Sequence, residues 1–420
     1  MTGMTLIARR LIAACLLAVV ATGGASAYKS GSTNRYYATW LASPNDADEP
    51  SLSRTRVAPP TGTLEDQTLR QIAHISIGGS QLRIKFSNLY GSTPLALERA
   101  RVAVSKDGEA AIDPATDTAI TFSARPGVII PAGSEVWSDP VNLTVRSLSN
   151  LAVSTYLKTK ASLRSAHRSA MRSNYLAAGD TTSAAQMPMD SRVGSYHWIT
   201  EIAVARPRAP KVVVAFGDSI TDGTGSGAGK NTRYPDQLSA RAILANTRSR
   251  DVSIVNAGIG GNRWLHDGLA LRGTERFIRD VLGTSGVTHT IVLLGVNDLG
   301  FAALPDSPLA APVTAQEMTA ALAGAVRAAH RKRVKIFLGT ILPYKGAFYF
   351  TEQGERTRQA VNDWIRKSSR ADGVIDFDEV MRDPQNPQTI LAPYHSGDHL
   401  HPSEAGYKKM AETIDLAKLR

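Results

Sequence analysis

The hydrophobic pattern of this chain changes its period near residue 211, and this change restricts the possible folds more than any other feature. Before it, apolar and polar residues alternate, as over Leu82–Phe86, which is typical of half-buried strands. After it, short and wholly apolar runs are separated by amphipathic helical segments, which is typical of a parallel sheet covered on both faces. Because 420 residues exceed what one hydrophobic core usually serves, we expect an all-β domain followed by an α/β domain.

The first domain, residues 28–206, is predicted to be a β-sandwich or a related all-β fold. Ala73–Ile77 and Leu82–Phe86 both alternate apolar and polar residues, and Gly78-Gly79 lies between them. Two alternating segments around a glycine turn predict a β-hairpin.

Two segments near the end of this half predict connections. Residues 164–195 are rich in Ser, Ala, Arg, Met and Gly and predict a long loop or a segment that lies over its neighbour. Residues 207–210 predict a linker. Because Tyr196–Val204 leads directly into the linker, we expect the β-domain to buttress the second domain, with binding of polysaccharide as the alternative.

The second domain, residues 211–420, is predicted to be a three-layer α/β/α sandwich of the flavodoxin-like type. Thr314 and Glu317 form a capping box at the start of an amphipathic helix. The five apolar runs predicted to form a parallel sheet are Val212–Phe216, Val252–Val255, Thr290–Leu294, Val334–Leu338 and Val374–Phe377.

The first 27 residues predict a cleavable secretory signal peptide. Arg9 and Arg10 precede the apolar run Leu11–Val20, and Ala25-Ser26-Ala27 supplies a small-residue cleavage site. This run is shorter than the roughly 20 apolar residues of a membrane span, so we expect a secreted or periplasmic protein without stable membrane insertion after cleavage.

Composition adds limits on chemistry and partners. The only cysteine, Cys15, lies within the predicted signal, so the mature chain would lack a thiol nucleophile, a disulfide and a thiolate metal site. The formal net charge of +11 favours acidic partners only weakly, and no nucleic-acid partner is predicted. The oligomeric state stays open.

Polar clusters follow the predicted strands of the second domain. Gly217-Asp218-Ser219 follows the first, Asn256–Arg263 the second and Gly295–Asp298 the third, while the fifth leads after a loop to Asp398–His401. In an open parallel sheet the functional groups collect beyond the carboxyl ends of the strands, so we expect these clusters at one edge.

The residue types in these clusters predict nucleophilic acyl transfer. Ser219 would be the nucleophile, with His401 as its base and Asp398 holding the imidazole in one tautomer. The backbone N–H groups of Ser219 and Gly261 and the amide of Asn297 would form the oxyanion hole. Gly260 remains an alternative to Gly261.

These blocks resemble the SGNH hydrolases, also called GDSL esterases and lipases. The resemblance covers residue 211 to the C-terminus, with the four blocks in the family's order, and it implies the family's serine mechanism without cofactor or metal. Asp218–Gly223 and Gly397–Pro402 look like the subgroup similar to bacterial acetylxylan esterases, which implies carbohydrate ester substrates.

We therefore expect a serine esterase that removes short acyl groups, foremost acetyl, from a small-molecule or polysaccharide ester. The alternatives are a lipase or aryl esterase for longer acyl chains, an acyltransferase with the same triad, and a non-catalytic carbohydrate-binding protein.

Four further residues are predicted to line the substrate pocket, with packing in the core as the alternative. Arg263 and Trp264 follow the oxyanion glycine, and Tyr344 and Phe348 follow the fourth strand.

The histidines near the C-terminus allow a metal site as an alternative interpretation. His395, Asp398, His399 and His401 could be read as a metal cluster, but the chain lacks an HExxH signature, so no metal is predicted.

Overall fold

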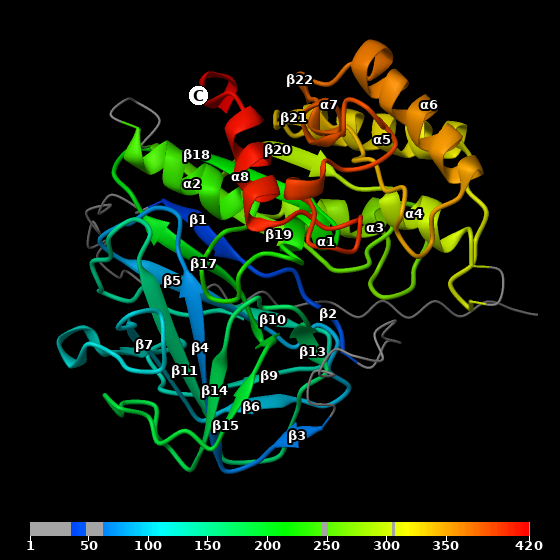
Figure 1. Cartoon of the computed structure of the whole chain (residues 1–420). Coiled ribbons are helices and arrows are strands. Elements are labelled where there is room, and N and C mark those ends of the chain that lie inside the picture. Colours follow the sequence, from blue (N-terminus) through cyan, green and yellow to red (C-terminus); the bar gives the residue numbers. More distant parts are fainter. Residues whose placement is uncertain (1–34, 48–61, 246–250, 305–306, 420) are drawn as a thin grey trace, which may run out of the picture. The chain divides into compact units, whose positions relative to one another are not determined.

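The computed structural model describes residues 35–47, 62–245, 251–304 and 307–419, which lie within one compact unit, Asn34–Arg420 (Figure 1). The predicted signal peptide, residues 1–27, lies outside the described residues, and the predicted domain boundaries remain predictions. No helix in the described part of the chain has the length and apolarity of a membrane span.

Antiparallel sheets make up the first half of the described chain. A four-stranded sheet has the order β1-β17-β5-β10, and a six-stranded sheet has the order β15-β14-β4-β11-β7-β8. Three small sheets pair β12 with β3, β16 with β13 and β2, and β6 with β9. The strands are β1 (Tyr36–Leu41), β2 (Asn45–Asp46), β3 (Thr63–Leu64), β4 (Gln67–His74), β5 (Leu82–Ser87), β6 (Leu95–Leu97), β7 (Arg99–Val104), β8 (Thr118–Ile120), β9 (Val128–Ile130), β10 (Glu135–Trp137), β11 (Asn150–Leu157), β12 (Ala161–Ser162), β13 (Ser165–His167), β14 (Asn174–Ala178), β15 (Ser191–Val193), β16 (Tyr196–His197) and β17 (Ile199–Ala205).

The two large sheets share one apolar core. In β5, Ile84 and Phe86 are buried while Arg83 and Lys85 are half-buried, as the alternation predicts. The buried residues of β5 pack in the same cluster as Val153 of β11 in the other sheet. The predicted sandwich-like all-β region is confirmed.

The predicted hairpin is wrong, because β4 and β5 lie in different sheets. The residues between them bond to other segments: Ile75 N donates to Ser149 O and Ser76 N donates to Thr39 O. The alternation over Leu82–Phe86 correctly indicated a strand, whereas only Ala73 and His74 of the segment Ala73–Ile77 lie in β4. Alternation also carries no information about which strands pair.

The expectation of one long loop over residues 164–195 is also wrong, because the segment contains β13, β14 and β15. Four of the five residues of β14 are buried, so no alternation marks this strand in the sequence. Asn174 satisfies its buried amide by accepting from Ile72 N at 2.8 Å and donating to Ser195 O at 2.7 Å.

The second half forms the predicted parallel sheet with helices on both faces. The strand order is β19-β18-β20-β21-β22, and every neighbouring pair is parallel. Its strands are β18 (Lys211–Gly217), β19 (Val252–Gly258), β20 (Val287–Leu293), β21 (Lys335–Gly339) and β22 (Gly373–Ile375). Its helices are α1 (Ser219–Asp222), α2 (Tyr234–Leu244), α3 (Gly273–Phe277), α4 (Val296–Phe301), α5 (Ala315–Arg331), α6 (Glu352–Ser368), α7 (Phe377–Met381) and α8 (Glu404–Thr413).

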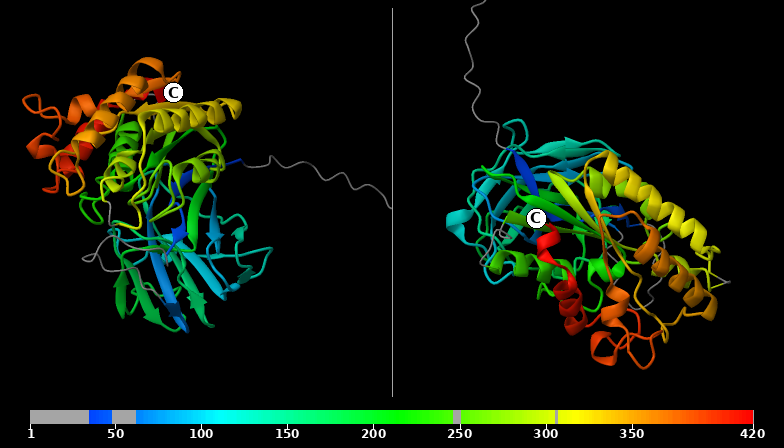
Figure 2. Two further views of the ribbon diagram at one scale, coloured as in Figure 1. Left: turned by 90° about the vertical axis from the view of Figure 1, so that its right-hand side faces the viewer. Right: turned by 90° about the horizontal axis from the view of Figure 1, so that it is seen from above.

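The view from above in Figure 2 shows α2 and α8 on one face of this sheet and α5 on the other. The predicted capping box starts α5, since Thr314 N donates to Glu317 Oε2 at 2.9 Å and Glu317 N donates to Thr314 Oγ1 at 3.2 Å. Because β18 lies between β19 and β20, loops from both neighbouring strands flank its carboxyl end.

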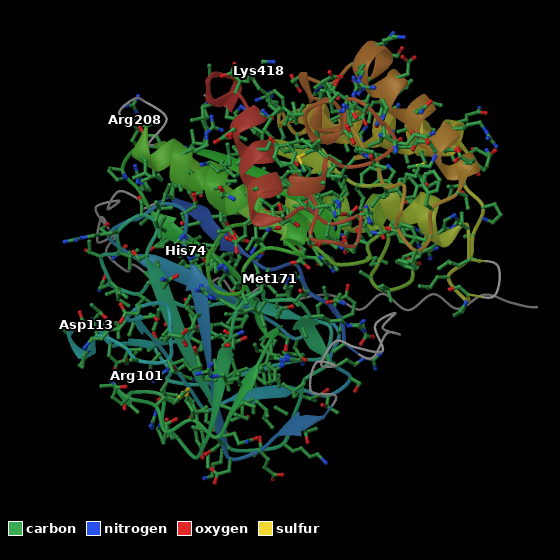
Figure 3. The ribbon with its side chains drawn as sticks, viewed as in Figure 1. His74, Arg101, Asp113, Met171, Arg208 and Lys418 are labelled. Carbon is green, nitrogen blue, oxygen red and sulfur yellow. The ribbon has the colours of Figure 1, made fainter. Side chains whose placement is uncertain are left out.

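Buried hydrogen bonds join the β-region to the α/β sheet. Tyr37 and Ala38 of β1 belong to the α/β core. Ala38 N donates to Ser285 O at 2.9 Å, and Ala38 O accepts from Ser253 Oγ of β19 at 2.7 Å. Met171, labelled in Figure 3, accepts from Gly229 N at 2.8 Å. These contacts favour the predicted buttressing role.

Ser76 offers a test of that role. It is 3% exposed, its Oγ lies 2.7 Å from Ser239 Oγ of α2, and it accepts from Ile254 N of β19 at 2.9 Å. Ser76→Ala leaves this N–H buried and unpaired, so we expect a loss of about 1–3 kcal/mol in the free energy of unfolding. Urea denaturation measures the loss, and the exposed Ser80→Ala is the control. Equal stability of the two variants would contradict the prediction.

Candidate active site

Ser219 lies where the buried strand β18 meets the short helix α1. Asp218 caps this helix by accepting a hydrogen bond from Ile220 N at 2.9 Å. The cap ends the strand and makes Ser219 the first helical residue, where its backbone N–H has no intrahelical partner. The Ser219 side chain therefore lies at the carboxyl end of β18.

His401 and Asp398 reach Ser219 from the loop before α8. Ser219 Oγ lies 2.8 Å from His401 Nε2, and His401 Nδ1 lies 2.6 Å from Asp398 Oδ2. The other oxygen, Asp398 Oδ1, accepts from Leu400 N at 3.0 Å and from His401 N at 2.8 Å. The loop turns tightly through His399, whose φ is +58°. One carboxylate thus fixes both the loop and the imidazole.

These contacts keep Asp398 ionised. Burial tends to raise its pKa, but the side-chain hydrogen bond and the charge of His401, with the two backbone N–H groups, hold the pKa of Asp398 well below its usual value. An ionised carboxylate at Nδ1 favours the tautomer whose Nε2 accepts the serine proton.

The geometry favours Gly261 over Gly260 as an oxyanion donor. Gly260 N donates to Asp222 Oδ2 at 3.0 Å, so its N–H is already used. Within the described residues, no hydrogen bond occupies the N–H of Gly261. Gly261 has φ +73°, and a Cβ there would come within 2.3 Å of Leu269 Cδ1, so the position favours glycine.

The amide of Asn297 is fixed from both ends. Its Nδ2 donates to Asn262 O at 3.1 Å, and its Oδ1 accepts from Tyr349 OH at 3.2 Å. Since Nδ2 carries two hydrogens, one remains for a substrate oxygen. Sequence reasoning missed Tyr349, because the aromatic run that contains it does not indicate which ring faces Asn297.

Sequence reasoning also missed Arg276, a fully buried arginine on α3. Its guanidinium donates to Gly217 O at 2.6 Å, to Ala257 O at 2.8 Å and to Asn262 Oδ1 at 2.8 Å. Asp280 lies 3.0 Å away and pairs with the charge. Arg276 thus joins the ends of β18 and β19 to the loop that carries Gly261, and no motif marks it.

Asp298 has a structural role. Its carboxylate accepts from Trp264 N at 2.7 Å and from Leu265 N at 2.9 Å. Asp298 therefore holds the loop that follows Gly261.

Three of the four predicted pocket residues are core residues instead. Arg263 is 4% exposed and donates to Leu309 O at 2.5 Å, Trp264 is 1% exposed, and Tyr344 is fully buried. The expectation that these three side chains line the pocket is corrected. Their surfaces pack in the core or, for Arg263, bind a backbone carbonyl, so they are not available to a substrate. Phe348 is 72% exposed and packs against the Tyr349 ring at 4.4 Å.

The histidines of the C-terminal loop have other contacts. The ring centroids of His395 and His399 lie 4.3 Å apart with the planes tilted by 32°. The two ring nitrogens of His401 face Ser219 and Asp398, respectively. Among the residues that the structure describes, no group of three or more His, Cys, Asp or Glu could hold a metal ion.

Comparison with known proteins finds a family match in the second half of the chain. Residues 215–409 match the family model described as GDSL-like lipase/acylhydrolase, and this range contains Ser219, Gly261, Asn297, Asp398 and His401. A search of curated proteins finds no match.

Several solved structures are similar to the chain. A lipase/acylhydrolase from Enterococcus faecalis is 19% identical, and the match covers 49% of this chain and 93% of that one with a TM-score of 0.38. A catalytic mutant of an acetylxylan esterase from Geobacillus stearothermophilus is 22% identical, with 50% and 94% covered and a TM-score of 0.38. A GDSL-like lipase from Bacteroides thetaiotaomicron is 18% identical, with 50% and 91% covered and a TM-score of 0.37.

Asp218 predicts a pH-dependent stability. Burial raises its pKa to about 7, and the charge of Asp298 adds to the rise. Because this pKa exceeds the usual 3.8, ionisation destabilises the folded state as pH rises from 3.8 to about 7. Asp218→Asn cannot ionise, so its gain in Tm over the native chain should be near zero at about pH 4, grow with pH and level off above about pH 7.

Thermal unfolding followed by circular dichroism across this pH range measures the gain, with Asp107→Asn in an exposed turn as the matched control. A gain of the same size at every pH would contradict the prediction.

Proposed function

Residues 215–409 belong to the GDSL-like lipase/acylhydrolase family, which makes the protein a carboxylic ester hydrolase, and on this premise we propose that it is a secreted serine esterase for short-chain acyl esters of carbohydrates. Acetyl is the foremost acyl group. The observation that carries the proposal is the continuous hydrogen-bonded path from Ser219 Oγ through His401 to Asp398.

The path supports a two-step mechanism. Ser219 Oγ attacks the acyl carbon while its proton passes to His401 Nε2, 2.8 Å away. Asp398 stabilises the imidazolium that forms. His401 then gives the proton to the leaving alcohol, which departs and leaves an acyl group on Ser219. Water, deprotonated by the same imidazole, releases the acid and restores the serine.

The oxyanion of each tetrahedral intermediate would be stabilised by donors that are already oriented. Ser219 N–H and Gly261 N–H are backbone donors, and Tyr349 and Asn262 O fix the amide of Asn297. Each donor of this kind contributes about 10²–10³ in rate.

The sequence supports two further parts of the proposal, namely the carbohydrate acetyl ester as substrate and secretion. The segments Asp218–Gly223 and Gly397–Pro402 resemble those of acetylxylan esterases, which favours carbohydrate acetyl esters. The predicted signal peptide, residues 1–27, favours secretion to the periplasm or the medium.

Longer acyl or aryl esters are the second candidate substrates, and Phe348 is the observation that favours them. It is 72% exposed and packs on Tyr349, which contacts Asn297. An exposed aromatic ring that packs on the neighbour of an oxyanion donor offers apolar surface to a long acyl chain or an aromatic group.

The proposed mechanism predicts how triad variants behave. Ser219→Ala should abolish turnover of acyl esters from C2 to C12, because no nucleophile remains. Asp398→Asn should lower kcat by about 10⁴, because the amide favours the wrong tautomer of His401. Initial rates on p-nitrophenyl esters and on acetylated xylan measure both variants, with Ser191→Ala in the exposed strand β15 as the control.

If the folded native chain turns over none of these esters, the esterase proposal fails and a carbohydrate-binding role gains weight. Full activity of Ser219→Ala would reject Ser219 as nucleophile.

The second candidate predicts a chain-length effect at Phe348. Phe348→Ala should lower kcat/KM for C8 and longer esters roughly tenfold through lost apolar burial, and leave C2 esters unchanged. The control is Ile129→Ala, an exposed apolar residue in the β-region. Equal loss on C2 and C8 esters would show that Phe348 does not contact the acyl chain.

A further inference from the structure

A histidine of the β-region contacts the helix that carries Ser219. His167 lies on β13 and is 5% exposed. Its Nε2 lies 3.0 Å from Oδ1 of Asp222, the last residue of α1, which is 1% exposed. The contact joins a strand of the β-region to the catalytic half of the chain.

The partners of His167 define its protonation state. Nδ1 lies 3.0 Å from Ser43 O, and Nε2 lies 3.0 Å from Asp222 Oδ1 and 3.1 Å from Ser169 O. Each of these partners is a carbonyl or carboxylate oxygen, which can only accept. A neutral imidazole has one N–H, whereas an imidazolium has two. His167 therefore satisfies both ring nitrogens only as an imidazolium.

Asp222 connects this cation to the oxyanion loop. While Oδ1 faces His167, Oδ2 accepts from Gly260 N at 3.0 Å. Gly260 precedes Gly261, the proposed backbone donor, and Asp222 lies one helical turn after Ser219. One carboxylate thus links the helix of the nucleophile to the loop of the oxyanion donor.

We propose that His167, as an imidazolium, is a positioning residue of the esterase site. By fixing Asp222 it holds Gly260, so that the N–H of Gly261 faces the substrate oxygen that becomes the oxyanion. The claim that His167 positions a catalytic group rests on the proposed function. It gives the β-region a direct part in the geometry of the site.

The charges around His167 support the ion pair. Burial tends to lower the pKa of His167, and the positive charge of Arg233 also lowers it. The charge and hydrogen bond of Asp222 outweigh both effects and raise the pKa above 6.5. Arg233, the N-cap residue of α2, lies 3.3 Å from Asp236. The other ring facing His167 is Tyr196, at 6.2 Å. Since the folded pKa is raised, the stabilisation is complete below about pH 6.5 and is lost as pH rises through the folded pKa.

His167→Gln in the full chain tests the positioning role, because glutamine can donate to Asp222 but cannot carry the charge or bond to Ser43 at the same time. We expect kcat on an acetyl ester to fall about 10- to 100-fold, since small displacements of catalytic groups cost up to about 10² in rate. KM should change less than about twofold, because the oxyanion forms only after substrate binds.

His197→Gln is the matched control. His197 is 1% exposed, and its neighbour across the strand pair is Ala166, next to His167. Its ring faces Ser195 Oγ and Leu163 O, both in the β-region. This variant should lose stability but keep the native kcat.

A spectroscopic measurement tests the charge without catalysis. In ¹H–¹⁵N spectra at about pH 6 the native chain should show two ring N–H resonances for His167, which His167→Gln removes. Asp222→Asn serves as the second variant, because its amide can still accept from Gly260 N and can donate to a neutral ring. It should reduce the two His167 resonances to one.

The outcomes separate the two proposals. A native chain without esterase turnover rejects the proposed function, while two His167 resonances would still support the ion pair. An active native chain with a single His167 resonance, or a folded His167→Gln with native kcat, overturns this inference.

Discussion

The buried guanidinium of Arg276 holds the site together at the point where β18 and β19 end. It donates to the carbonyls of Gly217 and Ala257 near the ends of two parallel strands, and the Gly217 carbonyl also accepts from Ile259 N at 3.2 Å. Its charge is balanced by Asp280. Removing one partner of such a buried pair typically costs about 3–5 kcal/mol. Arg276 and the hydrogen bond from Gly260 N to Asp222 together set the spacing between the nucleophile and the oxyanion loop.

Features set by neighbouring residues could be predicted from the sequence, and features set by distant packing could not. The five parallel strands follow from apolar runs, and Ser219, Asp398 and His401 follow from motifs at strand ends, since the fold brings such ends to one edge. The strand β14 and the separation of β4 from β5 depend on pairing between distant segments. Arg263, Trp264 and Tyr344 were placed in a pocket because a sequence does not show which way a side chain turns.

Two carboxylates near Ser219 show how environment separates chemical roles. Asp398 meets two backbone N–H groups and the imidazole of His401, so it remains ionised and can stabilise a cation. Asp218 is enclosed beside Asp298, and its pKa rises to about 7. The first acid suits catalysis and the second suits a helix cap. Neither role follows from the residue type alone.

The position of β1 has a consequence for the order of folding. Tyr37 and Ala38 are buried in the α/β core, and the backbone of Ala38 bonds to Ser285 and Ser253. The first described strand therefore cannot complete its contacts until most of the chain has been synthesised and, if it is exported, has crossed the membrane. Contacts between segments so distant in sequence slow folding, so the new chain must keep β1 accessible until its partners arrive.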